Sequence, residues 1–199
     1  MIPSHRDLCA FAREAHLLAV RNGFYDLAPR WPRLLKLIQG EFHEADADLR
    51  AGRKPGEMWL AHFPGFAFDI FGGEGVVTTT GTDSVVPYAP ADHGKIAGFL
   101  VEIADVCVRA LDSIDYAGAR PLIMQPPSDT ERARLASIPA DEFVELALTI
   151  TPASTVRDLS DIVYRCLEWC EAHNLPLWEV MQAKHAYNQT RPYKHGKAY

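Results

Sequence analysis

Two pairs of acidic residues are the first candidates for chemistry in this chain. Glu41 and Glu44 form one pair, and Glu102 and Asp105 form the other. Each pair is spaced i, i+3 in an apolar, helix-like segment, where Cβ atoms three residues apart lie about 5–6 Å from each other. Both carboxylates of a pair can therefore reach one ion, and hard oxygen ligands suit Mg²⁺ or Mn²⁺. We predict a divalent-metal site in which all four carboxylates are metal ligands.

The acidic pairs could also arise without any metal. Carboxylates about 5 Å apart repel by around 3 kcal/mol per pair at an effective dielectric near 20. Protons or cations must therefore relieve this repulsion. A solvated acidic face is the commoner origin of such a pair, and Arg109 could neutralise Asp105 as a salt bridge one helical turn away. A carboxylate-bridged di-iron site requires Glu-Xaa-Xaa-His motifs, and the sequence contains none.

A third candidate segment lies near the C-terminus. Lys184, Asn188 and Arg191 are spaced i, i+4, i+7, so they share one helical face, and no acidic residue follows Glu179. Lysine binds a phosphate as a point charge, arginine clamps it with two hydrogen bonds, and an amide can bind a sugar hydroxyl or a phosphate oxygen. A metal site together with these groups suggests a phosphate-bearing substrate, although a solvated basic face is the simpler alternative.

Most of the chain has the hydrophobic period of a helix. The expected helices span residues 7–21, 32–50, 92–113, 140–149, 155–173 and 176–190. Residues 52–94 differ, because glycine, proline, threonine and aromatic residues dominate and no helical period persists. Residues 65–71 and 76–80 flank Gly72-Gly73-Glu74-Gly75 and could form a β-hairpin there. The sequence thus predicts an all-α helical bundle with an irregular insertion at about 52–94.

Composition limits the possible classes of protein. The 199 residues are 48% hydrophobic and 23% charged, which fits one globular domain spanning residues 1–199. The net charge of −6 argues against non-specific nucleic-acid binding. We find no signal peptide and no apolar run of the ~18 residues that a membrane helix needs. We therefore expect a cytoplasmic protein without membrane contact, whose four cysteines are reduced thiols.

Together these segments resemble the MazG-like, all-α nucleoside triphosphate pyrophosphohydrolases. The resemblance rests on Glu41-Xaa2-Glu44 followed by Glu102-Xaa2-Asp105, and on the C-terminal run KHAYNQTRPYKHGK at residues 184–197. The segments NGFY at 22–25 and LIQGE at 37–41 are similar to the N-terminal half of the family. The resemblance covers about residues 8–51, 95–115 and 156–197.

The resemblance implies a four-helix core and hydrolysis of a (deoxy)nucleoside triphosphate to the monophosphate and pyrophosphate. It implies that the four carboxylates are the catalytic groups and hold Mg²⁺, which polarises the phosphate and lowers the pKa of an attacking water. It also implies a homodimer or homotetramer. The implied triphosphate-binding residues are Lys184, Asn188 and Arg191, with Lys194 and Lys197 as weaker candidates. The candidates to stack on the base are Phe24, Tyr25 and Trp31.

The chain departs from the family pattern in two places. The gap between Glu44 and Glu102 is far longer than the family's helix–loop–helix spacing, so residues 52–94 could be a lid, a specificity loop or an oligomer contact. Gly40 stands where the family often has a second acid, which leaves the number of metal ions open. Two other functions remain possible, namely a non-catalytic helical oligomer that binds nucleotides or a partner, and a purely structural oligomer.

Overall fold

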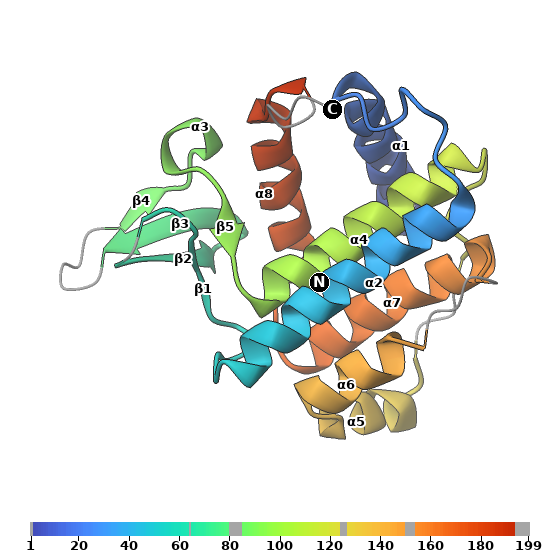
Figure 1. Ribbon diagram of the computed structural model, residues 1–199. Coiled ribbons are helices and arrows are strands. Elements are labelled where there is room, and N and C mark those ends of the chain that lie inside the picture. The colour runs from blue at the N-terminus through green and yellow to red at the C-terminus, as the bar shows by residue number, and fades with distance from the viewer. Residues whose placement is uncertain (1, 64, 80–84, 124–126, 150–153, 194–199) are drawn as a thin grey trace.

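The computed structural model describes residues 2–63, 65–79, 85–123, 127–149 and 154–193. These residues form eight helices and five strands (Figure 1). The helices are α1 (His5–Arg21), α2 (Trp31–Arg50), α3 (Pro90–His93), α4 (Phe99–Tyr116), α5 (Asp129–Ser137), α6 (Ala140–Ala147), α7 (Val156–Ala172) and α8 (Leu177–Thr190). The strands are β1 (Met58–Leu60), β2 (Phe66–Phe71), β3 (Glu74–Thr79), β4 (Val85–Pro87) and β5 (Ile96–Ala97).

The prediction of an all-α bundle is wrong, because the chain contains a five-stranded antiparallel sheet of order β4-β3-β2-β1-β5. The expected hairpin is confirmed as β2 and β3, and Phe71 pairs with Glu74 across a two-residue turn. Gly72 and Gly73 form that turn with φ values of 59° and 89°, as a type I′ hairpin requires. The other three strands have only two or three residues each. Strands this short are too short for an alternation of hydrophobic and polar residues to be recognised in the sequence.

Helix α4 is the centre of the bundle. Twelve of its 18 residues are buried, and it packs against α1, α2, α7 and α8. A helix that is apolar on most of its circumference must be covered on most sides, which explains this position. Helices α5 and α6 lie at the outer edge, beside α7 and α2 (Figure 1). The central position of the helix that carries Glu102 and Asp105 therefore follows from its sequence.

The sheet extends to one side of the bundle and joins it at the start of α4 (Figure 1). Strand β5 leads into α4 through Gly98, which has a φ of 129°. The expected helix over 92–113 is wrong in its first part, because the positive φ values of Gly94 and Gly98 separate α3, β5 and α4. Helix α3 and strand β3 both contact α8. The insertion thus supports the helix that carries Lys184.

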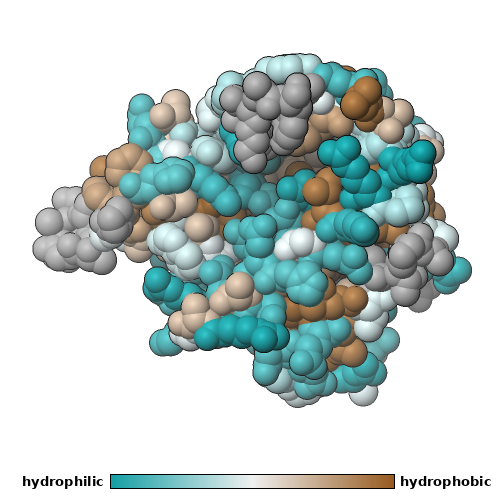
Figure 2. Space-filling model, viewed as in Figure 1, coloured by the Kyte–Doolittle hydropathy of each residue, from teal (hydrophilic) through white to brown (hydrophobic). Residues whose placement is uncertain are grey.

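The surface gives two further observations. On the face shown in Figure 2, hydrophilic residues cover much of the middle, and hydrophobic residues gather in smaller patches over the sheet and the lower helices. None of the helices in the described part of the chain is long and apolar enough to cross a bilayer. All four cysteines are free thiols, and Cys9 is the one that is not fully buried.

Two glycines provide a matched test of how the sheet is attached. A Cβ on Gly98 would clash with the backbone oxygen of Glu57, whereas a Cβ on Gly40, in the middle of α2, would meet nothing within 4 Å. We expect Gly98→Ala to destabilise the fold by ~2 kcal/mol or more, since both the contact and the positive φ are unfavourable. Gly40→Ala should instead stabilise it by up to ~1 kcal/mol. Urea unfolding measures both, and equal effects would contradict this account of Gly98.

Candidate metal centre

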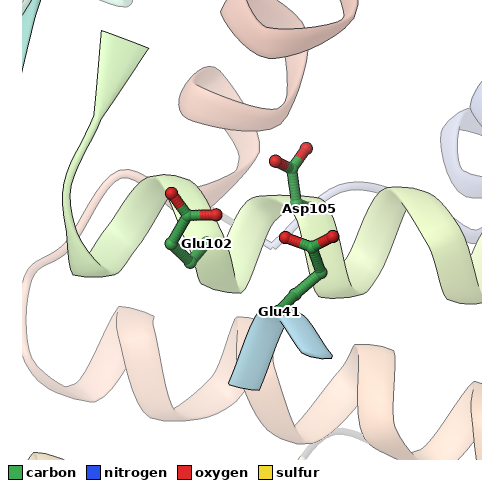
Figure 3. Close-up of side chains that lie close together, drawn as sticks. All are labelled: Glu41, Glu102 and Asp105. Atoms are coloured by element: carbon green, nitrogen blue, oxygen red, sulfur yellow. The ribbon is translucent and has the colours of Figure 1, made fainter. Parts of the chain in front are cut away.

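Three of the four predicted carboxylates meet between two helices. Glu102 and Asp105 project from the same side of α4, and Glu41 reaches toward them from α2 (Figure 3). One carboxylate oxygen from each lies within 4.8 Å of those of the other two. Glu41 and Glu102 are buried and Asp105 is partly exposed. We call these three residues the acid triad.

Glu44 does not belong to the triad. It lies one turn from Glu41 on α2 but is exposed, and its carboxylate contributes only by raising the pKa of Glu41. The rotation of α2 about its axis brings Glu41 to the interface with α4 and leaves Glu44 exposed. The described residues thus bring together three carboxylates where the sequence predicted four.

Two cations are bound to the triad. Lys184 Nζ lies 2.5 Å from Asp105 Oδ2, and Arg109 Nε lies 2.5 Å from Glu41 Oε1. Lys184 is only 2% exposed, and a buried lysine is rare unless a partner charge compensates it. Arg109 forms its ion pair across the helix interface, with Glu41, and not along its own helix with Asp105. Both cations hold their carboxylate partners in fixed positions.

Glu102 is the triad member that is not paired with a cation among the described residues. Its Oε2 is buried and has no hydrogen-bond partner among the described residues. Burial, and then the neighbouring Asp105, raise the pKa of Glu102 to about 8, while Lys184 and Lys95 oppose this shift. At neutral pH this carboxyl therefore keeps a proton or requires a cation. Three converging carboxylates with one oxygen unpaired fit the oxygen-ligand chemistry of Mg²⁺ or Mn²⁺.

Lys95 is a residue that sequence reasoning missed. It precedes β5, at the end of the insertion, and its charge lowers the pKa of both Glu102 and Asp48. Lys95 lies seven residues before Glu102, inside the segment expected to be one helix over 92–113, but the structure breaks that segment at Gly94 and Gly98, so helical spacing could not place it. Lys95 adds positive charge to the metal centre at the point where the insertion meets β5.

A cavity of about 140 Å³ opens beside the triad, and some of the predicted substrate-binding residues line it. Lys184, Asn188 and Arg191 line it together with Asp105. Phe24 and Tyr25 also line it, as do two arginines that were not predicted to bind substrate, Arg33 and Arg109. The cavity thus joins the metal centre to a basic wall and an aromatic wall.

Three other predicted substrate residues are not placed in this cavity. Trp31 donates its indole N–H to the backbone oxygen of Ser154 at 2.7 Å, and it is not among the cavity-lining residues. Its structural role is to hold the start of α2 against the segment before α7. Lys194 and Lys197 lie outside the described residues.

A second polar group lies at the end of the cavity remote from the triad. Asp112, two turns beyond Asp105 on α4, accepts a hydrogen bond at 2.8 Å from Nδ1 of His16 when the ring is protonated there. Tyr25 packs edge-on against the His16 ring, with centroids 4.7 Å apart. Burial raises the pKa of Asp112, and the hydrogen bond with His16 lowers it. Asp112 and Tyr25 both line the cavity.

Comparison of the chain with family models, curated proteins and solved structures finds no match. The geometry of the site therefore has to support any functional proposal by itself.

Glu102 should make stability depend on pH. Its pKa is higher in the folded chain (about 8) than its ordinary value of 4.5, so its contribution is fully present below about pH 4.5 and is lost as pH rises through 8. We expect Glu102→Gln to be more stable than wild type at pH 8.5 by ~1–3 kcal/mol, because it removes a buried, unpaired charge, with a smaller difference at pH 5. Chemical denaturation without metal measures this.

The control for this experiment is Glu44→Gln, because Glu44 is exposed and lies outside the acid triad. It should change stability little at either pH. A pH dependence that is the same in wild type and Glu102→Gln would show that Glu102 has an ordinary pKa.

Proposed function

We propose that this protein is a divalent-metal-dependent hydrolase that cleaves a nucleoside triphosphate to the monophosphate and pyrophosphate. The observation that carries the proposal is the convergence of Glu41, Glu102 and Asp105, from two helices, beside a cavity lined by Lys184 and Arg191. Carboxylates that bind a metal and cations that bind phosphate are both needed for phosphoanhydride hydrolysis. The resemblance to the MazG-like family supports the same reaction.

In this proposal the acid triad holds Mg²⁺ or Mn²⁺. The ion supplies polarisation of the phosphate and a lower pKa for the attacking water. Glu102 binds the ion only after losing its proton, so binding should release a proton near neutral pH. Arg109 orients the Glu41 carboxylate from the side through its ion pair, as outer hydrogen-bond partners of metal ligands commonly do.

The basic wall binds the phosphates. Lys184 is bonded to Asp105, and it can exchange this partner for a phosphate oxygen when Asp105 binds the ion. The Arg191 guanidinium lies 5.7 Å from the centre of the Tyr187 ring, at the end of α8. A guanidinium held in this way is suited to bidentate phosphate binding. Both cations thus face the leaving pyrophosphate or the retained monophosphate.

One observation favours a second function, a non-catalytic nucleotide-binding protein. The ion pairs of Lys184 and Arg109 already neutralise two of the three triad carboxylates, so the site can stay folded without a metal. Nucleotide binding seen by calorimetry without any release of pyrophosphate would favour this alternative. The homodimer or homotetramer implied by the resemblance also stays a proposal, and light scattering tests it.

The decisive experiment measures pyrophosphate release from a panel of NTPs and dNTPs with Mg²⁺ or Mn²⁺. We expect turnover by wild type, and a loss of about 100-fold or more in Glu41→Gln and in Asp105→Asn, since even outer partners of metal ligands cost up to this much. Glu44→Gln is the matched control, and it should keep most of the activity because Glu44 lies outside the triad.

Two results would contradict these expectations separately. No turnover of any triphosphate with either ion would reject the hydrolase. A loss in Glu44→Gln as large as that in Glu41→Gln would instead restore the four-carboxylate site predicted from the sequence.

A further inference from the structure

The cavity beside the acid triad contains buried polar atoms that need partners. His185 Nδ1 and Asn188 Oδ1 both belong to cavity-lining residues, and neither has a hydrogen-bond partner among the described residues. His185 is only 8% exposed, and its ring packs against Phe11 with centroids 5.2 Å apart. A buried polar atom without a partner costs about 1–3 kcal/mol. This part of the wall is therefore suited to a guest that forms hydrogen bonds.

These two residues differ in kind from the rest of the basic wall. Burial lowers the pKa of His185, so its imidazole is neutral at pH 7 and can donate or accept at Nδ1. An amide likewise offers both a donor and an acceptor. Such groups match the edge of a neutral heterocycle better than a phosphate, which accepts only. Asn188 lies four residues, or about 6 Å, beyond Lys184 along α8, so one helix offers a cation and then an amide.

The volume of the cavity limits the size of the guest. At about 140 Å³ it is close to the ~150 Å³ cavity that holds a benzene ring, and well below the ~300–1,000 Å³ of pockets for drug-sized ligands. One six-membered ring fits this space better than two fused rings. Phe24, which is 46% exposed, and Pro29 provide flat apolar walls, against which a planar ring can pack.

We propose that this cavity receives the pyrimidine ring of a nucleotide, and that His185 and Asn188 hydrogen-bond its polar edge. The inference rests on the proposed function, because it assigns the substrate class of the same site. Asn188 Oδ1 accepts a hydrogen bond from a ring N–H or an exocyclic amine, and His185 Nδ1 bonds a carbonyl or an N–H of the ring. The phosphates then extend along α8 toward Lys184 and the acid triad.

The test compares kcat/KM for CTP, UTP and dTTP with that for ATP and GTP at one Mg²⁺ concentration. We expect a preference of about tenfold or more for the pyrimidine triphosphates. Ala19→Leu adds three carbons to the cavity wall and should raise the KM for CTP by about tenfold or more. The matched control is Ala10→Leu, on the exposed side of the same helix, which should leave KM unchanged.

A second variant keeps the test valid if Ala19→Leu does not fold. Asn188→Leu keeps a side chain of similar size but removes the Oδ1 acceptor, and it should raise the KM for CTP more than that for ATP. A change that is equal for both nucleotides would overturn the assignment of Asn188 to the base.

The failures of the two proposals are distinguishable. Equal kcat/KM for purine and pyrimidine triphosphates, with pyrophosphate released from both, overturns the pyrimidine assignment and leaves the hydrolase intact. If no triphosphate is cleaved, the hydrolase fails, and calorimetry with CMP and AMP then tests the cavity alone. Tighter binding of CMP that Ala19→Leu weakens supports a pyrimidine pocket. Equal binding, or no binding, overturns it.

Discussion

The structure depends on the charge balance of three carboxylates buried between α2 and α4. When ionised they carry a charge of −3, and the two cations paired with them, Arg109 and Lys184, supply +2. Buried charges are tolerated only when they are paired and hydrogen-bonded. The negative charge that these cations do not balance belongs to Glu102, whose pKa is raised by burial and then by the neighbouring Asp105. A proton or a divalent ion completes the balance, which links the stability of the bundle to the proposed chemistry.

This balance also explains the placement of α8 and of the insertion. Lys184 must reach Asp105 from a third helix, so α8 has to pack closely on α4. The sheet and α3 contact α8 from the other side, and Lys95 at the end of the insertion adds positive charge near Glu102. The segment that has no counterpart in the family resemblance thus supports α8, which carries the lysine paired with Asp105.

The sequence anticipated the candidate site in part, and the reasons are local. Helical spacing predicted that Glu102 and Asp105 share a face of one helix, and that Lys184, Asn188 and Arg191 share a face of another. The same spacing could not tell whether Glu44 as well as Glu41 faces Glu102, because that depends on how α2 is rotated about its axis when it packs. Trp31 looked like a base-stacking residue, but its indole is used to hold a neighbouring backbone segment.

The sequence by itself determined the elements with a strong period or a special turn. These are the long helices, the β2–β3 hairpin with its two-glycine turn, and the central position of the most apolar helix. Only the tertiary structure decided which side chains meet: Glu41 with Arg109, Asp105 with Lys184, and Lys95 near Glu102. The physical reason is that periodicity reports the environment of one element at a time. Contacts between elements depend on their packing angles and rotations, which no local pattern encodes.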